Sequence, residues 1–503
     1  MWECVISAFD VYFCSTKYLI VQHTSHSICL KEGIYFGVAG NPARTSEQIS
    51  NLTTSVSIEK NLGLDPISIF SRLRNQFPGE CFLLESVEGT KKTARYSFIG
   101  ASPISTFKSE RRNVELNGER SEQVNPYDYF RSYFKSIRCG TSEIAPFSGG
   151  MVGYLGYDSI EYFEDKIRRA DGGSQHFPDM YFIIPMHLVC VDHLNSQTLL
   201  ISHGKITELR EALHDKSEIK SQGVRVGNGV PNTSPGEFEK MILSAKEHIL
   251  DGDIFQAVLS RRTDFEYKGD PLEMYRALRA LNPSPYLFYL DYDEVKIIGS
   301  SPEMLVRLEG KKLTTRPLAG TRPRSSDPEE DEKLKIEMLL DEKERAEHLM
   351  LVDLHRNDMG RVSKFGTVKV TELMSAEKYS HVQHIVSNVE SELREDCDGF
   401  DALRSCFPAG TVTGAPKVRA MELISELERD ARGPYAGAVG FFDFNGDMDF
   451  AITIRSITAS GNRASVQAGA GIVADSVPER EYAETEHKME ATLQALKSLE
   501  GER

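Results

Sequence analysis

The sequence lacks the features of membrane and secreted proteins. No stretch reaches the roughly 18 uncharged apolar residues that a membrane-spanning helix needs. The longest apolar run, Met180 to Val191, is short and rich in residues that favour strands, so we expect a buried strand there. The N-terminus has no basic lead before its apolar residues and is interrupted by Asp10, unlike a secretory signal. We therefore expect a cytoplasmic protein without a membrane segment.

Excess positive charge is also absent. The 503 residues carry a formal net charge of -16, which argues against nucleic acid or an anionic membrane surface as the main partner. The eight cysteines show no CxxC pair and no metal-ligand spacing, so we expect reduced, structural thiols. With 40% hydrophobic residues, the chain is long enough for one large or two medium domains.

Composition divides the chain into four segments. Residues 1–56 show no sustained period and end in a polar run, which suggests an N-terminal extension of unclear role. Residues 57–216 mix helices with dominant strands, and residues 217–235 are a linker rich in Gly, Ser, Asn and Pro. In residues 236–503, strands and helices alternate irregularly, and strands outnumber those of a regular βαβ array. This pattern favours an α+β fold over a doubly wound α/β fold.

Two expected helices carry acidic residues at helical spacing. Glu481, Glu484 and Lys488 lie on one face near the C-terminus, and Glu344 and Glu347 repeat the pattern before a run that is apolar on nearly every side. Taken alone, each stripe is explained by a solvated helix edge with an i, i+4 ion pair. Two facing helices that each offer a carboxylate would instead suit a hard divalent cation bound by few protein oxygens. Our hypothesis is Mg2+.

Two further polar residues stand in apolar strands. Gln256 begins an expected strand, and His384 shares a strand face with Val382 and Val386, pointing to the core. A lone strand-end Gln is usually a satisfied amide, and a lone core His is more often structural. The His is nevertheless the side chain best suited to proton transfer.

Three loops or strand ends are suited to an anion. Residues 314–327 combine Pro, Gly and three Arg in a loop, and a Gly-rich loop at 407–416 leads into a helix whose first N–H groups are free. Gly469 and Gly471 would let a ligand approach the backbone of a strand closely. The Gly-rich loop lacks the GK[ST] ending of a P-loop, so nucleotide binding is unsupported. Together these patterns suggest a small polycarboxylate substrate.

Several long motifs then suggest a family. The stretches PLAGTRPR, EHLMLVDLHRNDMGRV, HIVSNVESEL, FPAGTVTGAPKVRAMELI, GPYAGAVGFFDF and AGAGIVADSVPEREYAETEHK closely resemble, in order, the chorismate-utilising enzymes. Within that family the chain is most similar to the large components of anthranilate synthases. The resemblance runs from about Asp65 to the end, and it implies an α+β sandwich of two large antiparallel sheets with flanking helices and an active site in a cleft.

The resemblance also implies roles for matching residues. Mg2+ would be held by Glu347 and Glu484, and it would bind the ring carboxylate of chorismate. The implied catalytic residues are His384, Thr411, Gln256, Glu344 and Glu481. The implied substrate-binding residues are Ala319, Gly320, Thr321, Tyr435, Arg455, Gly469, Ala470, Gly471 and Lys488. Of these, Tyr435 and Arg455 would bind the enolpyruvyl carboxylate, and Thr411 and His384 would lie near the ring and its leaving C4 hydroxyl.

Two positions discriminate between reactions within the family. Members that add water carry a Lys at the position of Gln256 as general base, whereas ammonia is already a nucleophile. Aminodeoxychorismate synthases commonly carry a reactive Lys where this chain has Ala319. The alanine side chain cannot attack the substrate. The resemblance thus implies ammonia addition at C2 with loss of the C4 hydroxyl, then elimination of pyruvate to give anthranilate. The alternatives are an aminodeoxychorismate synthase and a non-catalytic tryptophan-sensing protein.

The resemblance extends to regulation and partners. A tryptophan feedback pocket would involve Glu85, Ser86, Pro283, Ser284, Pro285, Tyr286 and Leu287, although an apolar strand and a Pro-rich turn also explain these residues. No Cys lies in the elbow motif of a glutamine amidotransferase, so ammonia would come from a separate amidotransferase subunit in a hetero-oligomer, or from solution. His355 and His487 depart from the usual family residues.

Overall fold

The computed structural model describes residues 51–60, 62–86, 95–140, 145–170, 172, 177–215, 217, 222–379 and 382–499. It also describes the backbone of three short strands, β1 (Phe9–Phe13), β2 (Leu19–His23) and β3 (His26–Ser27). β1 pairs antiparallel with β2, and β2 with β3. Most of the predicted extension, 1–56, lies outside the described residues.

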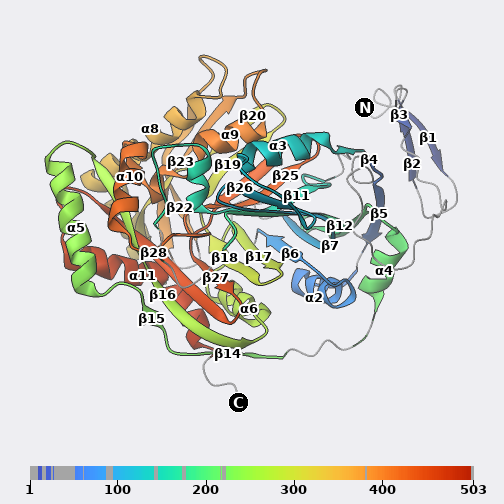
Figure 1. The fold of residues 1–503 in the computed structure, drawn as a ribbon, viewed down its shortest axis with the longest axis horizontal. Coiled ribbons are helices and arrows are strands. Elements are labelled where there is room, and N and C mark those ends of the chain that lie inside the picture. The colour runs from blue at the N-terminus through green and yellow to red at the C-terminus, as the bar shows by residue number, and fades with distance from the viewer. Residues whose placement is uncertain are drawn as a thin grey trace.

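Two large antiparallel sheets form the centre of the protein (Figure 1). The first sheet runs in the order β14 (Val224–Val226) and β15 (Val230–Pro231), β16 (Gln256–Gly269), β28 (Arg463–Ile472), β27 (Ser456–Ser460), β18 (Val295–Ser301), β17 (Tyr286–Tyr292), β6 (Cys81–Glu85), β7 (Tyr96–Glu110), β12 (Met180–Asp192), β13 (Gln197–Ser202) and β5 (Ser55–Lys60). A short strand, β24 (Gly414–Ala415), also pairs with β16. The predicted buried strand at residues 180–191 is therefore β12.

The second sheet shares β7 and β12 with the first. Its order is β9 (Glu119–Ser121), β8 (Asn113–Leu116), β7, β12, β11 (Gly150–Leu155), β25 (Ala438–Asp443), β26 (Met448–Ile452), β19 (Met304–Glu309), β20 (Lys312–Thr315), β23 (Val382–Glu392) and β22 (Lys369–Lys378), with β21 (Leu318–Pro323) beside β20 on β23. The first and last parts of β7 and β12 pair in different sheets, and their register shifts between Ile184 and Pro185. A further pair, β4 (Asn51–Leu52) with β10 (Arg138–Cys139), is parallel.

Helices cover the outer faces of both sheets. On the first sheet lie α2 (Pro66–Gln76), α4 (Ile206–His214), α6 (Leu272–Leu281) and α11 (Pro478–Lys497), with α5 (Pro235–Leu250) and α10 (Lys417–Leu427) at the end formed by β16 and β28. On the second sheet lie α3 (Pro126–Ser136), the 3-10 helix η2 (Tyr157–Tyr162), α8 (Glu342–Gly360) and α9 (Gly399–Cys406). Side chains of both sheets, including Phe288 and Val152, meet in a core between them. The predicted α+β sandwich is confirmed.

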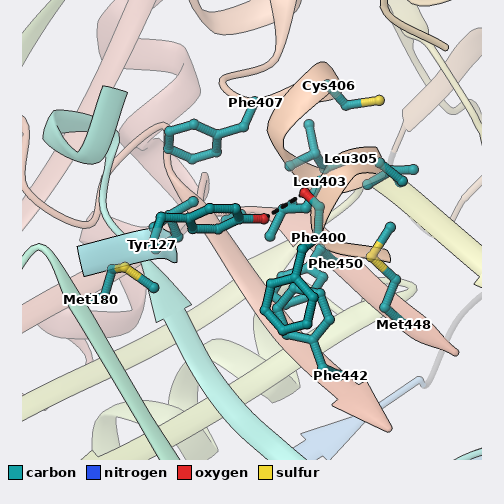
Figure 2. Close-up of a cluster of buried hydrophobic side chains, with 14 of the residues drawn as sticks. Tyr127, Met180, Leu305, Phe400, Leu403, Cys406, Phe407, Phe442, Met448 and Phe450 are labelled. Carbon is teal, nitrogen blue, oxygen red and sulfur yellow. Dashed lines mark hydrogen bonds between the residues drawn. The ribbon is translucent and has the colours of Figure 1, made fainter. Parts of the chain in front are cut away.

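The largest core lies between the second sheet and its helices. Figure 2 shows Phe400 of α9 against Phe442 of β25, where the rings stack with centroids 4.2 Å apart. An aromatic pair of this kind contributes about 0.5–1.5 kcal/mol beyond the area it buries. The hydroxyl of Tyr127, on α3, donates to the Phe400 carbonyl at 2.7 Å, so the helices are also joined by a buried hydrogen bond.

Two details differ from simple expectation. The predicted linker contains β14 and β15, which pair with the long strand β16 because its edge leaves backbone groups free there. Helix α8 is less buried than its apolar run predicts, since Leu349 is 47% exposed while Val352 is buried. Helix α5 begins at a capping box that Ser234 and Glu237 form.

The described helices include none that is long and apolar enough to cross a membrane. The remaining described helices are α7 (Pro328–Leu340) and the 3-10 helix η3 (Gly410–Val412), which both lie close to α8 along the chain or in space.

Candidate active site

Helices α8 and α11 bring the predicted glutamates together. Burial raises the pKa of Glu347, Lys343 lowers it, and the neighbouring carboxylates Glu344, Glu484 and Glu481 raise it further. These electrostatic effects require the acidic stripes of the two helices to lie near each other, although they are more than 130 positions apart in the chain. The two stripes therefore form one acidic cluster rather than two separate solvated edges.

The neighbouring cations leave part of this acidic charge uncompensated. Arg322 Nη1 lies 3.0 Å from a carboxylate oxygen of Glu344, and Lys488 Nζ lies 2.6 Å from one of Glu484, whereas Lys343 Nζ is 3.7 Å from Glu347. Glu481 is buried, and burial followed by the Glu484 charge raises its pKa. A cluster of oxygen donors short of positive charge fits a hard divalent cation.

The geometry limits how many protein ligands such a cation has. Among the residues that the structure describes, no three His, Cys, Asp or Glu side chains converge as a metal site. Two glutamates, one from each helix, are compatible with this geometry, and they leave coordination positions for water and substrate.

Strand β28 offers bare backbone beside these helices. A Cβ atom at Gly469 would lie 3.2 Å from the Tyr435 hydroxyl, and one at Gly471 would lie 2.5 Å from the amide nitrogen of Gln256. Because neither glycine has a side chain, the Tyr435 hydroxyl and the Gln256 amide can lie close to the backbone of β28. Lys488 Nζ donates to the Gly469 carbonyl at 3.0 Å, which ties α11 to the same segment. Ala470, between the glycines, is buried on the opposite face of the strand.

Arg455 places a partly buried cation next to the glycine segment. Its guanidinium donates to the Lys488 carbonyl, and its pKa is lowered by burial despite the nearby Tyr435 and Glu484. Burial raises the pKa of Tyr435 to about 12, so this hydroxyl stays protonated at neutral pH. A partly buried guanidinium and a neutral phenol are suitable donors for a carboxylate.

His384 lies on β23, beside the segment of β21 that packs on α8. It pairs with Thr321 across β23 and β21, and its Nδ1 is 2.9 Å from the Gly320 carbonyl, so Nδ1 carries the proton. Burial lowers the pKa of His384 to about 4, which keeps the ring neutral and leaves Nε2 with a free lone pair. Gly320 adopts a positive φ of 61°, and a Cβ there would lie 3.1 Å from a carboxylate oxygen of Glu344. Ala319 and Gly320 lie in strand β21, where the sequence predicted a loop, and this strand therefore packs directly on α8.

A buried acid that the sequence did not single out completes the site. Glu303, between β18 and β19, is 4% exposed, and burial raises its pKa to about 8 while Thr411 and Lys488 lower it. The Thr411 hydroxyl lies close enough to affect that pKa, but its geometry falls short of an ordinary hydrogen bond. Glu303 is thus a protonated carboxylic acid at neutral pH. Its only signal in the sequence is a Glu at the start of the apolar stretch SPEMLV.

The residues predicted for a feedback pocket lie elsewhere in the first sheet. Glu85 pairs with Leu287 across β6 and β17, and its carboxylate accepts hydrogen bonds from Tyr275 and Arg279 of α6. The buried Ser86 hydroxyl has no hydrogen-bond partner among the described residues. The structure therefore brings the two predicted halves of this pocket, 85–86 and 283–287, side by side.

The predicted cleft is not tested by the structure, whereas the surroundings of the two unusual histidines are described. Two surface cavities of about 570 and 470 Å3 include none of the predicted site residues, so the predicted active-site cleft stays a prediction. His355, one of the unusual residues, is buried, and its Nδ1 lies 2.6 Å from the Thr315 hydroxyl. The other, His487, is exposed on α11.

Comparisons with known proteins agree with this geometry. A family model described as chorismate binding enzyme matches residues 79–494. The anthranilate synthase component 1 of Acetivibrio thermocellus is 46% identical over 461 residues, covering 86% of this chain and 92% of that protein. The protein of the same name from Methanothermobacter thermautotrophicus is 45% identical over 443 residues, with the same coverage of both chains. The crystal structure of anthranilate synthase component I from Streptococcus pneumoniae superimposes with a TM-score of 0.72 at 36% identity, covering 86% of this chain and 98% of that one. The chain therefore belongs to the family of chorismate-binding enzymes.

Proposed function

We propose that the protein converts chorismate and ammonia into anthranilate, pyruvate and water. The observation that carries this proposal is the convergence of the α8 and α11 glutamates with Arg455, Tyr435 and the glycines of β28, in a chain that is 40–46% identical to proteins named anthranilate synthase component 1. Chorismate carries two carboxylates, and the site offers two matching groups. The ring carboxylate would approach the acidic cluster through a cation, and the enolpyruvyl carboxylate would bind Arg455 and Tyr435.

Mg2+ is the cation that we propose for this cluster. Glu347 and Glu484 would hold it, with Glu344 and Glu481 beside them, because oxygen donors with unneutralised charge suit this ion. When bound, Mg2+ would neutralise the ring carboxylate and orient the ring. Lys488, held by Glu484 and the Gly469 carbonyl, adds a positive charge next to the same segment.

Glu303 is the residue that we propose as general acid. Ammonia attacks C2 of the ring, the double bonds shift, and the C4 hydroxyl leaves as water after it receives the proton of Glu303. The proton at C2 and the enolpyruvyl group then depart together, which gives the aromatic amine and pyruvate. Neutral His384, with Nε2 free, is placed to accept a proton in the course of these steps.

The N-terminal half supports two further proposals. The name component 1 in the relatives indicates a second component, so we propose a separate glutamine amidotransferase subunit as the source of ammonia. We also propose that tryptophan binds beside the paired ends of β6 and β17, at residues 85–86 and 283–287, and inhibits the enzyme. The buried Ser86 hydroxyl, beside Glu85, supports this site because it has no hydrogen-bond partner among the residues that the structure describes, and a ligand could supply one.

The decisive experiment is product identification. The purified chain is incubated with chorismate, Mg2+ and ammonium at mildly alkaline pH, and products are identified by fluorescence and mass. We expect anthranilate and pyruvate in equal amounts, and no product after chelation of the metal. A 4-amino product would show instead that the chain is an aminodeoxychorismate synthase, and binding of tryptophan without turnover would favour a sensing protein.

A further inference from the structure

A buried ion pair joins three separate segments of the candidate site. Glu428, the residue that follows α10, and Arg432 lie four residues apart, and their side chains are 6% and 1% exposed. Arg432 donates from Nε and Nη2 to the two carboxylate oxygens of Glu428 at 2.8 and 2.6 Å. This bidentate arrangement fixes the plane of the guanidinium group.

The remaining donors of Arg432 reach two other parts of the chain. Nη2 donates to the Val258 carbonyl on β16 at 2.7 Å, and Nη1 donates to the Val412 carbonyl in η3 at 2.8 Å. Val412 follows Thr411, the residue beside Glu303. Val258 lies against Gly469, since a Cβ on that glycine would be 3.0 Å from a methyl group of Val258. The Arg432 guanidinium thus fixes the position of the Thr411 segment relative to Val258, which lies against Gly469 of β28.

Glu428 extends the same connection along β16. One of its oxygens accepts hydrogen bonds from both the backbone N–H and the hydroxyl of Ser260, at 2.7 and 2.9 Å. The Ser260 hydroxyl also accepts from Gln467 on β28 at 2.9 Å. The pair therefore links the loop after α10 to the two strands that carry Gln256 and the glycines.

The loop that follows Arg432 carries Tyr435 into the site. The guanidinium carbon of Arg432 lies 4.5 Å from the centre of the Tyr157 ring. The Gly433 carbonyl accepts a hydrogen bond from the Tyr157 N–H at 2.8 Å, and the Gly433 N–H donates to the Asp158 carboxylate at 2.7 Å. These contacts leave little freedom for residues 432–435, and they set where the Tyr435 hydroxyl meets Gly469.

We propose that Glu428 and Arg432 are positioning residues for the reaction of this enzyme, acting together as one clamp. The clamp sets the mutual geometry of Thr411, Tyr435 and Val258, and none of its own atoms needs to touch the substrate. This inference rests on the proposed function, because it assigns the clamp to the same substrate site. A misplacement of site groups by about 1 Å is enough to lower catalysis about 100-fold.

The test uses variants that keep charge or shape while they break the geometry. Arg432→Lys keeps a positive charge but cannot bind Glu428 with two parallel donors and reach both carbonyls. Glu428→Gln keeps the shape but loses the charge that holds the guanidinium. Both full-length variants are compared with wild type for kcat, for KM of chorismate and for thermal unfolding, with Mg2+ and ammonium present.

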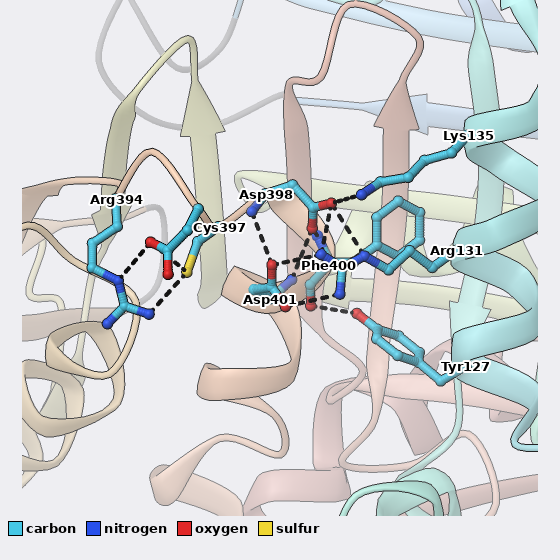
Figure 3. Close-up of polar contacts among 9 residues, drawn as sticks. Tyr127, Arg131, Lys135, Arg394, Cys397, Asp398, Phe400 and Asp401 are labelled. Atoms are coloured by element: carbon cyan, nitrogen blue, oxygen red, sulfur yellow. Dashed lines mark hydrogen bonds and ion pairs between the residues drawn. The ribbon is translucent and has the colours of Figure 1, made fainter.

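A matched control is the same substitution in another ion-paired arginine. Arg131 of α3 binds Asp398 and Asp401 at the start of α9, at 2.9 and 2.7 Å, and Lys135 joins the same network (Figure 3). None of the predicted site residues contributes to these ion pairs. Arg131→Lys therefore measures what loss of a bidentate arginine does to stability alone.

We expect Arg432→Lys and Glu428→Gln each to lower kcat/KM for chorismate by about 10- to 100-fold, with a raised KM and a reduced kcat. Arg131→Lys should stay within about twofold of wild type. Because the pair acts as a unit, kcat/KM of the double variant should lie no more than about twofold below that of the less active single variant. Kinetic constants within twofold of wild type in both single variants, with only a lowered unfolding temperature, would overturn the proposal. Failure of the wild-type chain to form anthranilate would count against the proposed function, whatever the variants do.

Discussion

The protonated state of Glu303 leads to the sharpest prediction about this site. Its carboxyl is buried, one oxygen has no hydrogen-bond partner among the described residues, and burial raises the pKa from 4.5 to about 8. Glu303→Gln mimics the neutral acid in shape but cannot release a proton. We expect kcat to fall about 100- to 10,000-fold, the usual contribution of a general acid, with KM for chorismate little changed.

The same substitution should stabilise the fold at neutral pH. The folded pKa of Glu303 lies above its unfolded value, so the unfolded chain ionises first as pH rises, and stability is lost between pH 4.5 and about 8. At pH 7 the loss amounts to 2.5 pH units at about 1.4 kcal/mol each, or about 3.5 kcal/mol, for a pKa near 8. Glutamine does not ionise, so the variant should regain energy of this order.

The assay combines turnover with urea unfolding at pH 5 and pH 8. Wild type should lose activity above about pH 8, as the acid ionises, and should be less stable at pH 8 than at pH 5 through this group. The variant should be inactive yet more stable than wild type at pH 8. Glu309→Gln, which replaces an exposed carboxylate at the end of β19, serves as the control with neither effect. Two results would refute the reasoning. One is turnover by Glu303→Gln within tenfold of wild type. The other is a change in unfolding free energy between pH 5 and pH 8 that is the same in the variant as in wild type.

Three further outcomes are expected. Glu347→Gln and Glu484→Gln should each lower activity at least about 100-fold and weaken Mg2+ binding, measured by calorimetry, because each removes an anionic ligand; unchanged binding would remove them from the metal site. Gly469→Ala should raise KM for chorismate about 10-fold or more, because its Cβ would approach Tyr435 Oη to 3.2 Å, and an unchanged KM would mean that no ligand uses this strand. Ser86→Ala should weaken inhibition by tryptophan about 5- to 30-fold without changing kcat, since it removes a buried polar group, and equal inhibition would place that pocket elsewhere.

Local periodicity was enough to find part of the site. The spacing of the glutamates predicted an acidic face on each of two helices, because residues three and four apart share a helix face whatever the tertiary structure is. That the two faces meet was a hypothesis, since it depends on the tertiary structure. The start of β16 at Gln256 was predicted from the local sequence. The roles of His384, Arg455 and Tyr435 came from family resemblance and not from pattern.

Other features depend on contacts that no local pattern contains. Glu303 becomes an acid only because strands and loops distant in sequence bury it, and the sequence around it reads as an ordinary strand. The partners of Arg432 lie directly after α10, in η3 and on β16. No local sequence pattern connects these segments, so the clamp could not be predicted before the fold was known. Likewise, Val224 looked like linker because its pairing partner on β16 lies more than 40 residues away.

The exchange of strands between the two halves of the chain has a consequence for synthesis. Strand β11 pairs with β25, whose residues follow almost 290 positions later, and β6 pairs with β17 some 200 positions later. When the first half leaves the ribosome, its strands still have open edges that only later residues can close. The nascent chain therefore holds unpaired, apolar strands until nearly all of it has been translated, so we expect slow folding and a need for chaperones. Separate expression of residues 57–216 should accordingly give an aggregating fragment rather than an independent regulatory domain.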